Sequence, residues 1–279
     1  MQYKLLTMPE INPNLPKTVN PATVQVCLRE NYEGIGTGVD MKRPVVIVLP
    51  GGGYAYTSPR EADPVAMQFF AAGFQTLTLY YSCAPDRYPA ALLQVAATIL
   101  WVRRNAEELH ADPNRIFVIG FSAGGHLAAS AGTMWKEPIL SETLGAESRL
   151  FRPDGMILGY PVIMYNELGH KGSFKNLLGE GLTDEEYGKF SLEKRVDDDT
   201  CKAFLWHTWA DGGVPVENSL EMAKALRKHN IPFEMHIYPT GGHGLSVVNE
   251  QSSRDDQPQM RDPHIATWMN LCIEWIKQN

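Results

Sequence analysis

Short apolar runs alternate along this sequence with longer stretches that have helical periodicity. The apolar runs are residues 44–49, 74–81, 115–119, 155–161, 203–208 and 232–238. Apolar side chains recur at helical spacing over residues 62–72, 88–108, 123–135, 216–229 and 262–277. Short, continuously apolar strands between helices are typical of a mostly parallel sheet that is covered on both faces. The alternation therefore predicts an α/β fold.

The alternation is interrupted at two places. Within residues 1–40, only the weakly alternating stretch 22–29 suits an outer strand, and the segment before it is expected to drape over the body or start an edge strand. Residues 162–200 are polar, contain glycines and have only short helical pieces. We interpret 162–200 as a small cap-like insertion, so that residues 1–279 form a single domain. The tripeptide at 112–114 (DPN) predicts a turn before the strand at 115–119.

The composition argues against several classes of partner. The 279 residues carry a net charge of −7 without a long basic run, which disfavours nucleic acid or an anionic membrane surface as the main partner. No stretch approaches the ~18 apolar residues of a membrane-spanning helix, and the N-terminus has no signal-like apolar run. The four cysteines lie far apart with no CxxC pair, so we expect buried thiols rather than a zinc site or disulfides. These features predict a cytoplasmic protein without a metal.

Ligands of a parallel sheet bind beyond the carboxyl ends of its strands, so functional residues are expected in the loops that follow the predicted strands. Gly120-Phe121-Ser122-Ala123-Gly124 fits the pattern G-x-S-x-G at a predicted strand-to-helix junction. A serine at the tip of such a turn sits in strained backbone, and the two glycines leave room for the crowding. The helix N-terminus behind it favours developing negative charge. Ser122 is therefore a candidate nucleophile.

A serine needs a base, and a group that orients the base, before it is nucleophilic at neutral pH. His243 lies in Gly-Gly-His-Gly after the last predicted strand, where the glycines make sense if the loop must bring the imidazole to a set point. Asp211 directly follows the apolar run at 203–208 and is the candidate orienting acid. His126, one helical turn after Ser122, is expected to pack or hydrogen-bond beneath the turn.

Three glycines, Gly51 to Gly53, follow the apolar run at 44–49 and Pro50. Without a Cβ they let the main chain approach a ligand and aim its N–H groups at it. The spacing fits neither a phosphate-binding loop nor a dinucleotide-binding fingerprint. Four loops at one sheet edge thus supply, in chain order, a donor loop, a serine turn, an aspartate and a histidine.

These motifs resemble those of the α/β-hydrolase superfamily, and within it the small esterase/lipase group that includes acetyl-xylan-esterase-like (sugar acetyl esterase) proteins. The resemblance covers roughly residues 40–279 and rests on LPGGGY (49–54), DPNRIFVIGFSAGGHLAA (112–129), HTWADGGVPVENS (207–219) and GGHG (241–244). Many hormone-sensitive-lipase-like esterases have His where this chain has Pro50, and Asp where it has Phe121. The oxyanion donors of such enzymes are main-chain groups, so neither departure removes them.

The resemblance implies an eight-stranded, mostly parallel sheet and a catalytic triad of Ser122, Asp211 and His243, with no cofactor. It also implies an oxyanion hole from the N–H groups of Gly52, Gly53 and Ala123. The implied activity is hydrolysis of carboxylic esters through an acyl-enzyme.

Residues 162–200 are too few to form a large lipase lid. A small, open acyl pocket is therefore expected, which favours short acyl groups such as acetate. Acetylated sugars or xylo-oligosaccharides fit both this expectation and the resemblance. Four aromatic residues could stack on a sugar or serve as packing: Tyr54, Tyr56, Trp209 and Trp135. Two alternatives stay open at this stage: an amide hydrolase of the same fold, arylformamidase-like or peptidase-like, and a non-catalytic hydrolase-fold binding protein. An edge strand or the final helix could also pair two chains into a homodimer.

Overall fold

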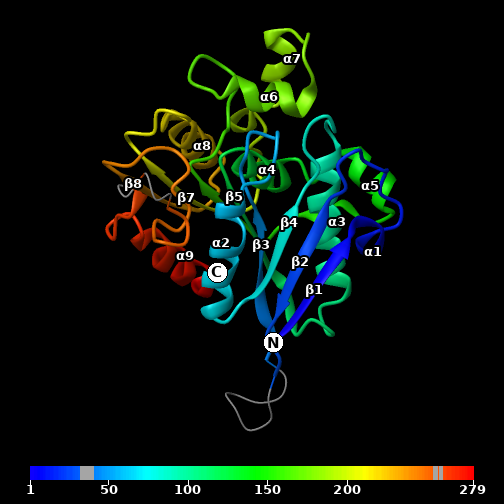
Figure 1. Ribbon diagram of the computed structural model, residues 1–279. Coiled ribbons are helices and arrows are strands. Elements are labelled where there is room, and N and C mark those ends of the chain that lie inside the picture. Colours follow the sequence, from blue (N-terminus) through cyan, green and yellow to red (C-terminus); the bar gives the residue numbers. More distant parts are fainter. Residues whose placement is uncertain (32–40, 254–256, 258–259) are drawn as a thin grey trace.

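A twisted sheet runs through the middle of the molecule (Figure 1). The computed structural model describes residues 1–31, 41–253, 257 and 260–279. Within them the sheet has eight strands in the order β1-β2-β4-β3-β5-β6-β7-β8. The strands are β1 (Gln2–Thr7), β2 (Thr23–Leu28), β3 (Arg43–Leu49), β4 (Gln75–Tyr80), β5 (Ala111–Phe121), β6 (Gly155–Gly159), β7 (Ala203–Thr208) and β8 (Phe233–Tyr238).

The strands from β4 to β8 in this order are parallel, and β2 is antiparallel to both of its neighbours, β1 and β4. The mostly parallel eight-stranded sheet implied by the resemblance is therefore confirmed. The strand expected at 22–29 as an outer strand lies second, because β1 pairs with its free edge. The N-terminal segment thus begins in the sheet. Residues 32–40 of the predicted 1–40 segment lie outside the described residues.

Helices cover both faces of the sheet. The α-helices are α1 (Met8–Ile11), α2 (Asp63–Ala71), α3 (Ala90–Arg104), α4 (Ala123–Thr133), α5 (Pro138–Leu144), α6 (Lys171–Leu178), α7 (Asp184–Gly188), α8 (Glu217–Lys228) and α9 (Thr267–Gln278). The part of the chain that the structure describes also has three short 3-10 helices, η1 (Pro59–Glu61), η2 (Ser148–Phe151) and η3 (Leu192–Lys194). The core residues of α3, α4 and α8 pack on one face, and those of α2 and α9 pack on the other.

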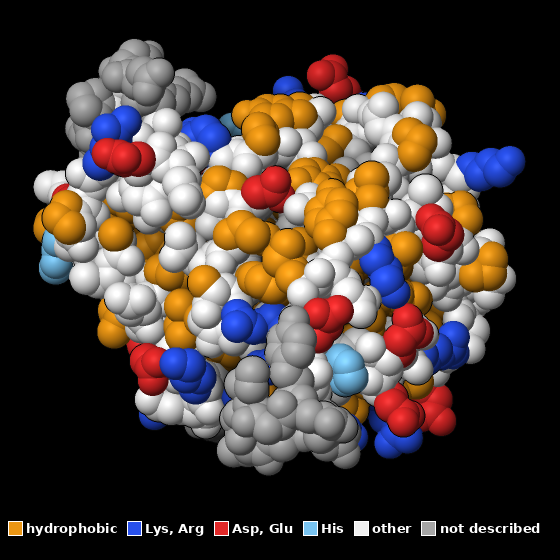
Figure 2. All heavy atoms as spheres, turned by 60° about the horizontal axis from the view of Figure 1, so that its bottom comes forward, with side chains coloured by type: hydrophobic (Ala, Val, Ile, Leu, Met, Phe, Trp, Pro, Cys, Tyr) orange, Lys and Arg blue, Asp and Glu red, His pale blue; other side chains and the backbone are white. Residues whose placement is uncertain are grey.

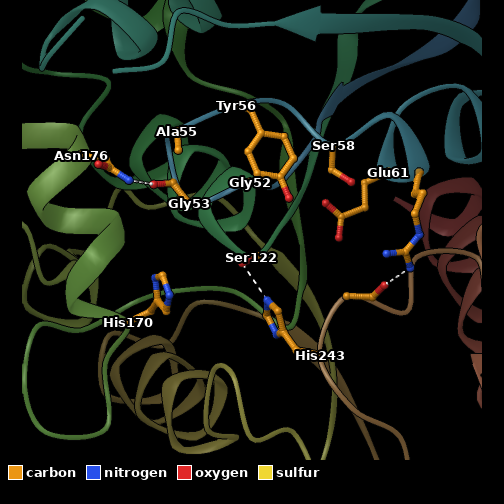
Figure 3. Close-up of a pocket in the computed structure, with 12 residues that line it drawn as sticks. Gly52, Gly53, Ala55, Tyr56, Ser58, Glu61, Ser122, His170, Asn176 and His243 are labelled. Atoms are coloured by element: carbon orange, nitrogen blue, oxygen red, sulfur yellow. Dashed lines mark hydrogen bonds between the residues drawn. The ribbon is translucent and has the colours of Figure 1, made fainter. Parts of the chain in front are cut away.

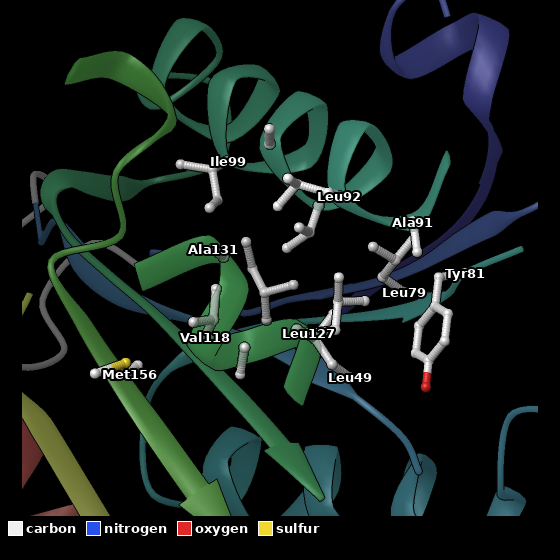
Figure 4. Packing of buried hydrophobic residues seen from close by; sticks show 14 of the residues in the cluster. Leu49, Leu79, Tyr81, Ala91, Leu92, Ile99, Val118, Leu127, Ala131 and Met156 are labelled. Atoms are coloured by element: carbon white, nitrogen blue, oxygen red, sulfur yellow. The ribbon is translucent and has the colours of Figure 1, made fainter. Parts of the chain in front are cut away.

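The alternation of side chains along β3 explains these two layers. Val45, Ile47 and Leu49 belong to the apolar cluster under α3 and α4, whereas Val46 and Val48 belong to the cluster under α2 and α9. Figure 4 shows Leu49 beside Leu127 of α4 and near the α3 side chains. A strand buried on both faces needs an unbroken apolar run, which is the pattern that predicted it.

The predicted turn at 112–114 lies inside a strand rather than before one. The pairing of β5 with β3 jumps from Arg43↔Ala111 to Val45↔Ile116, so the extra residues form an irregularity within β5. The Asp112 carboxylate accepts a hydrogen bond from the Asn114 N–H at 2.9 Å, which is the local turn that the sequence indicates. Residues 111–121 are therefore one strand with a bulge.

Residues 162–200 carry α6, α7 and η3 and lie at the upper end of the sheet in Figure 1, beyond α4. A small separate cluster of Val162, Phe174, Tyr187 and Val214 packs this segment against the loop after β7. The segment therefore lies over the edge of the sheet at which the parallel strands end.

Apolar side chains cross the middle of the face shown in Figure 2, with basic and acidic side chains distributed around them. Both signs of charge are thus interspersed on this face. Among the described helices, none is long and apolar enough to cross a membrane.

Candidate active site

Ser122 occupies the sharp turn between β5 and α4, with a φ of 54° and a ψ of −119°. A Cβ on Gly120 would lie 1.9 Å from the Gly124 carbonyl oxygen, and a Cβ on Gly124 would lie 2.1 Å from the Leu49 carbonyl oxygen. Neither contact is sterically possible, so both positions require glycine. The G-x-S-x-G spacing therefore reflects a turn so tight that the main chain before Ser122 contacts the main chain after it.

The structure brings Ser122, His243 and Asp211 together (Figure 3). The Ser122 Oγ lies 2.8 Å from His243 Nε2, and His243 Nδ1 lies 2.8 Å from Asp211 Oδ2. With the proton of the neutral imidazole on Nδ1, the ring donates to Asp211 and accepts from the Ser122 hydroxyl. The three residues follow β5, β7 and β8, so the parallel sheet delivers them to one edge.

The Asp211 carboxylate is buried, and the protein satisfies it with hydrogen-bond donors. Its Oδ1 accepts from the main-chain N–H groups of Gly213 and Val214, each at 2.9 Å. Burial raises the pKa of this carboxyl, but the hydrogen bonds from His207 and His243 outweigh burial and hold the pKa well below its ordinary value. Asp211 is therefore a carboxylate at any pH at which the protein would be assayed.

His207 is a second histidine beside Asp211 that the sequence did not single out for this role. Its Nε2 lies 2.9 Å from the Val214 carbonyl oxygen and 3.3 Å from Asp211 Oδ2. Its Nδ1 lies 2.8 Å from the Ser219 hydroxyl, from which it can accept. The carbonyl can only accept, so the ring proton is on Nε2 and faces Asp211 as well. The four-residue spacing of the two residues is the one sequence signal for this contact.

The glycine loop after β3 leaves two of its N–H groups available. The Gly51 N–H donates to Glu61 Oε2 at 2.8 Å. Among the described residues, the N–H groups of Gly52 and Gly53 have no hydrogen-bond acceptor, and both glycines line the cavity in front of Ser122. The N–H of Ala123 belongs to the first residue of α4 and has no acceptor within the helix. The role of Gly52, Gly53 and Ala123 as oxyanion donors stays a prediction.

The cavity in front of Ser122 and His243 has a volume of about 400 Å³. Its wall combines polar and apolar surface and consists of Gly52, Gly53, Ala55, Tyr56, Ser58, Arg60, Glu61, Ser122, His170, Asn176, His243 and Gly244. The lining comes from the glycine loop, from η1, from the insertion at 162–200 and from the loop after β8. The cavity is thus the place where the separate loops of the carboxyl edge converge.

Of the four aromatic candidates for sugar stacking, Tyr56 lines this cavity and Tyr54 does not. Tyr54 packs instead of stacking on a substrate: the residue is 2% exposed and its hydroxyl contacts His126 Nδ1 at 3.0 Å. Trp209 is exposed but is not among the residues that line the cavity. Trp135 lies just after α4, and Lys136 and Arg152 contact its ring.

His126 has the structural role that its position indicates. Its ring is buried, with Nδ1 facing the Tyr54 hydroxyl and Nε2 at 3.0 Å from the Phe190 carbonyl oxygen. Burial lowers the pKa of this histidine to about 4, although the hydrogen bond to Phe190 opposes the shift. The neutral ring thus ties the glycine loop and the insertion to α4.

Glu61 and Arg60 brace the site, and no sequence motif revealed them. Glu61 is buried and accepts a hydrogen bond from the Tyr160 hydroxyl at 2.7 Å. Burial raises the pKa of Glu61, and its hydrogen bonds from Tyr160 and Gly51 oppose that shift. Arg60 donates to the Gly244 carbonyl at 2.5 Å and so holds the loop that carries His243.

The described residues contain no group of three or more His, Cys, Asp and Glu side chains that could hold a metal ion. All four cysteines are buried free thiols, as the sequence predicted.

A serine lies on a strained strand-to-helix turn, and a histidine and a buried aspartate lie in line with it at the carboxyl edge of a mostly parallel sheet. This arrangement defines an α/β-hydrolase of the serine type. The family model of BD-FAE matches residues 36–226. The chain belongs to the BD-FAE family, and the resemblance to small esterases is confirmed.

Curated relatives include the Endo-1,4-beta-xylanase B of Butyrivibrio fibrisolvens, which is 37% identical over 221 residues, 76% of this chain and 34% of that protein. The Acetylxylan esterase of Xylanibacter ruminicola is 30% identical over 206 residues, 72% of this chain and 40% of that protein. This chain therefore matches only about a third to two fifths of the length of these relatives.

Several solved structures match almost the whole chain. The acetyl ester-xyloside bifunctional hydrolase of Caldicellulosiruptor lactoaceticus has a TM-score of 0.82 and 34% identity, covering 99% of this chain and 96% of its own. The carboxylesterase Cest-2923 of Lactobacillus plantarum has a TM-score of 0.82 and 28% identity, covering 100% of this chain and 98% of its own. The α/β-hydrolase fold is thus shared over the full chain.

Proposed function

We propose that this chain hydrolyses carboxylic esters of short acyl groups, above all acetate, with Ser122 as nucleophile. The observation that carries the proposal is the hydrogen-bonded series from Ser122 Oγ through His243 to the Asp211 carboxylate, which opens into the cavity. The names of the relatives support the same class of reaction.

Acylation begins when Ser122 Oγ attacks the ester carbonyl carbon and its proton moves to His243 Nε2. The Nδ1–H of the ring stays hydrogen-bonded to Asp211, whose negative charge stabilises the imidazolium. The carbonyl electrons move to the oxygen, and the resulting oxyanion accepts hydrogen bonds from the loop N–H groups of Gly52 and Gly53 and from that of Ala123. Each such donor contributes about 3 kcal/mol to the stability of the transition state.

The tetrahedral intermediate collapses when the bond to the leaving alcohol breaks and His243 Nε2–H protonates the alcohol oxygen. The product of this step is an acyl group on Ser122. Water then enters, gives a proton to His243 and attacks the acyl carbon. A second collapse returns the proton to Ser122 Oγ and releases the carboxylic acid.

Acetylated sugars or xylo-oligosaccharides are the proposed substrates. A cavity of about 400 Å³ has to receive both the acyl group and the alcohol, which favours a small acyl group. The polar side chains in its wall, among them Ser58, Arg60 and Asn176, suit an alcohol that carries further hydroxyl groups. One relative is called an acetylxylan esterase and one structural neighbour an acetyl ester-xyloside hydrolase, which supports the same class.

The test is an activity panel on the wild type and Ser122→Ala. The panel compares p-nitrophenyl acetate, butyrate and octanoate, an acetylated xylo-oligosaccharide and N-formylkynurenine, an amide substrate. We expect acetyl esters to be hydrolysed fastest, and Ser122→Ala to lose about three to six orders of magnitude in kcat because the nucleophile is gone. Esterase activity retained by Ser122→Ala would overturn the assignment, and a preference for N-formylkynurenine would replace ester with amide hydrolysis.

A further inference from the structure

His170, at the start of the insertion helix α6, presents a hydrogen-bond donor to the cavity. Its Nδ1 lies 3.2 Å from the Ser173 main-chain nitrogen and 2.8 Å from the Ser173 hydroxyl. The main-chain N–H can only donate, so Nδ1 carries a lone pair and caps the helix. The proton of the neutral ring is therefore on Nε2, for which the described residues offer no acceptor.

The ring of His170 lies beside the reacting groups. It lines the cavity together with Ser122 and His243, and the two histidines lie on either side of Ser122 in Figure 3. A Cβ on Gly53 would be 3.9 Å from His170 Cε1, so the ring also borders the glycine loop. Burial and the nearby His243 both lower the pKa of His170, which favours the uncharged ring.

The helix that carries His170 is fixed to the body of the protein. Asn176, one and a half turns along α6, donates from Nδ2 to the Gly53 carbonyl oxygen at 2.9 Å. Phe174 packs edge-on against the buried His126 ring, with the ring centroids 5.2 Å apart. His170 therefore stands on a rigid support at a set distance from the glycine loop, as a group that positions a substrate must.

We propose that His170 binds the alcohol part of the ester, donating its Nε2–H to a hydroxyl or ring oxygen of a polyhydroxylated alcohol. The inference rests on the proposed ester hydrolysis and gives the insertion a role in substrate choice. The carbonyl oxygen is assigned to the glycine-loop donors, and the leaving oxygen must reach His243. His170 lines the same cavity and takes no part in these steps, so it is available to bind the remainder of the alcohol. An uncharged donor suits an uncharged oxygen better than a carboxylate or phosphate.

Two esters of similar ring size test this role: methyl 3-O-acetyl-β-xylopyranoside and cyclohexyl acetate, which has no further oxygen on its alcohol. In His170→Asn the shorter side chain can still cap α6, because Asn is a good N-cap residue, but it withdraws the donor from the cavity. We expect the ratio of kcat/KM for the xyloside to kcat/KM for cyclohexyl acetate to fall about three- to tenfold, the value of one neutral hydrogen bond. Most of the change should appear in KM.

His110→Asn is the matched control, because His110 lies just before β5, at the opposite end of that strand from Ser122, and Asn tolerates its positive φ of 46°. Its substrate ratio should equal that of the wild type. An unchanged ratio in His170→Asn, or an equal loss on both esters, would overturn the role of His170 while leaving ester hydrolysis intact. A wild type that hydrolyses neither ester would instead overturn the proposed function, and the inference with it.

Discussion

Asp211 is held as a buried carboxylate by donors from three directions. The main-chain N–H groups of Gly213 and Val214 bind one oxygen, and His243 and His207 face the other. This arrangement keeps the pKa of Asp211 low, so its negative charge faces the imidazolium of His243 whenever that imidazolium forms. At the residue scale the site depends on this fixed charge as much as on Ser122.

Asp211→Asn removes the charge and keeps the shape. The amide can donate to His243 Nδ1, which places the ring proton on Nε2, where it cannot accept from Ser122. We expect kcat for an acetyl ester to fall about 10⁴-fold, as for the equivalent change in serine proteases. Steady-state kinetics measures the loss, and thermal unfolding checks that the variant is folded. A loss below tenfold would contradict the role assigned to Asp211.

Sequence reasoning could predict Ser122, Asp211 and His243 because each lies in a short loop after a strand, and the order of the loops fixes their meeting point. It could not place Tyr54, whose side-chain direction depends on a φ of 58° and on the distant His126. Glu61 had no local signature either, because the Tyr160 hydroxyl that donates to it lies 99 residues further along the chain.

At the scale of the elements, the turn from β5 to α4 is the part of the fold that the chemistry constrains most. β5 pairs with β3 and β6 over its apolar half. Helix α4 packs back against β5 and β6. The turn between them has no space for a side chain at Gly120 or Gly124. The strands were predictable because a doubly covered parallel sheet demands continuous apolar runs. The bulge at 112–114 was not, because the pairing with β3 decides whether a turn interrupts a strand or lies within it.

Gly124→Ala should therefore unfold more readily than the wild type. The new Cβ would lie 2.1 Å from the Leu49 carbonyl oxygen and 2.5 Å from that of Pro50, and rigid main chain cannot yield as a side chain does. We expect the free energy of unfolding in urea to fall by about 3 kcal/mol. Gly188→Ala in α7 is the control, since its nearest contact is the flexible Lys194 Nζ at 3.9 Å. Equal stability of the two variants would show that the turn is not crowded.

At the scale of the whole molecule, three segments that are far apart in sequence meet on one buried histidine. His126 of α4 accepts from Tyr54, which follows the glycine loop, and donates to the Phe190 carbonyl of the insertion. Both bonds use the neutral ring. The nucleophile helix, the donor loop and the insertion therefore share one group that burial keeps uncharged.

This contact predicts a pH dependence of stability. The pKa of His126 is lowered to about 4 in the folded protein, against about 6.5 in an unfolded chain, so the unfolded state binds more protons between these values. The stability that depends on the neutral His126 ring is fully present above pH 6.5 and is lost as the pH falls towards 4. The free energy of unfolding changes by about 3 kcal/mol over this range. Urea unfolding at intervals from pH 7 to pH 4 measures it. His126→Gln should show a shallower decline, and a decline as steep as that of the wild type would assign the effect to other groups.

The central claim is that Ser122 is a nucleophile activated by His243, and covalent labelling tests it most directly. A fluorophosphonate probe reacts with activated serines, and peptide mass spectrometry then locates the adduct. The account predicts a single phosphonyl group on the peptide that contains Ser122, no adduct in Ser122→Ala and much slower labelling in His243→Ala. An unlabelled Ser122 in protein that hydrolyses acetyl esters would contradict it.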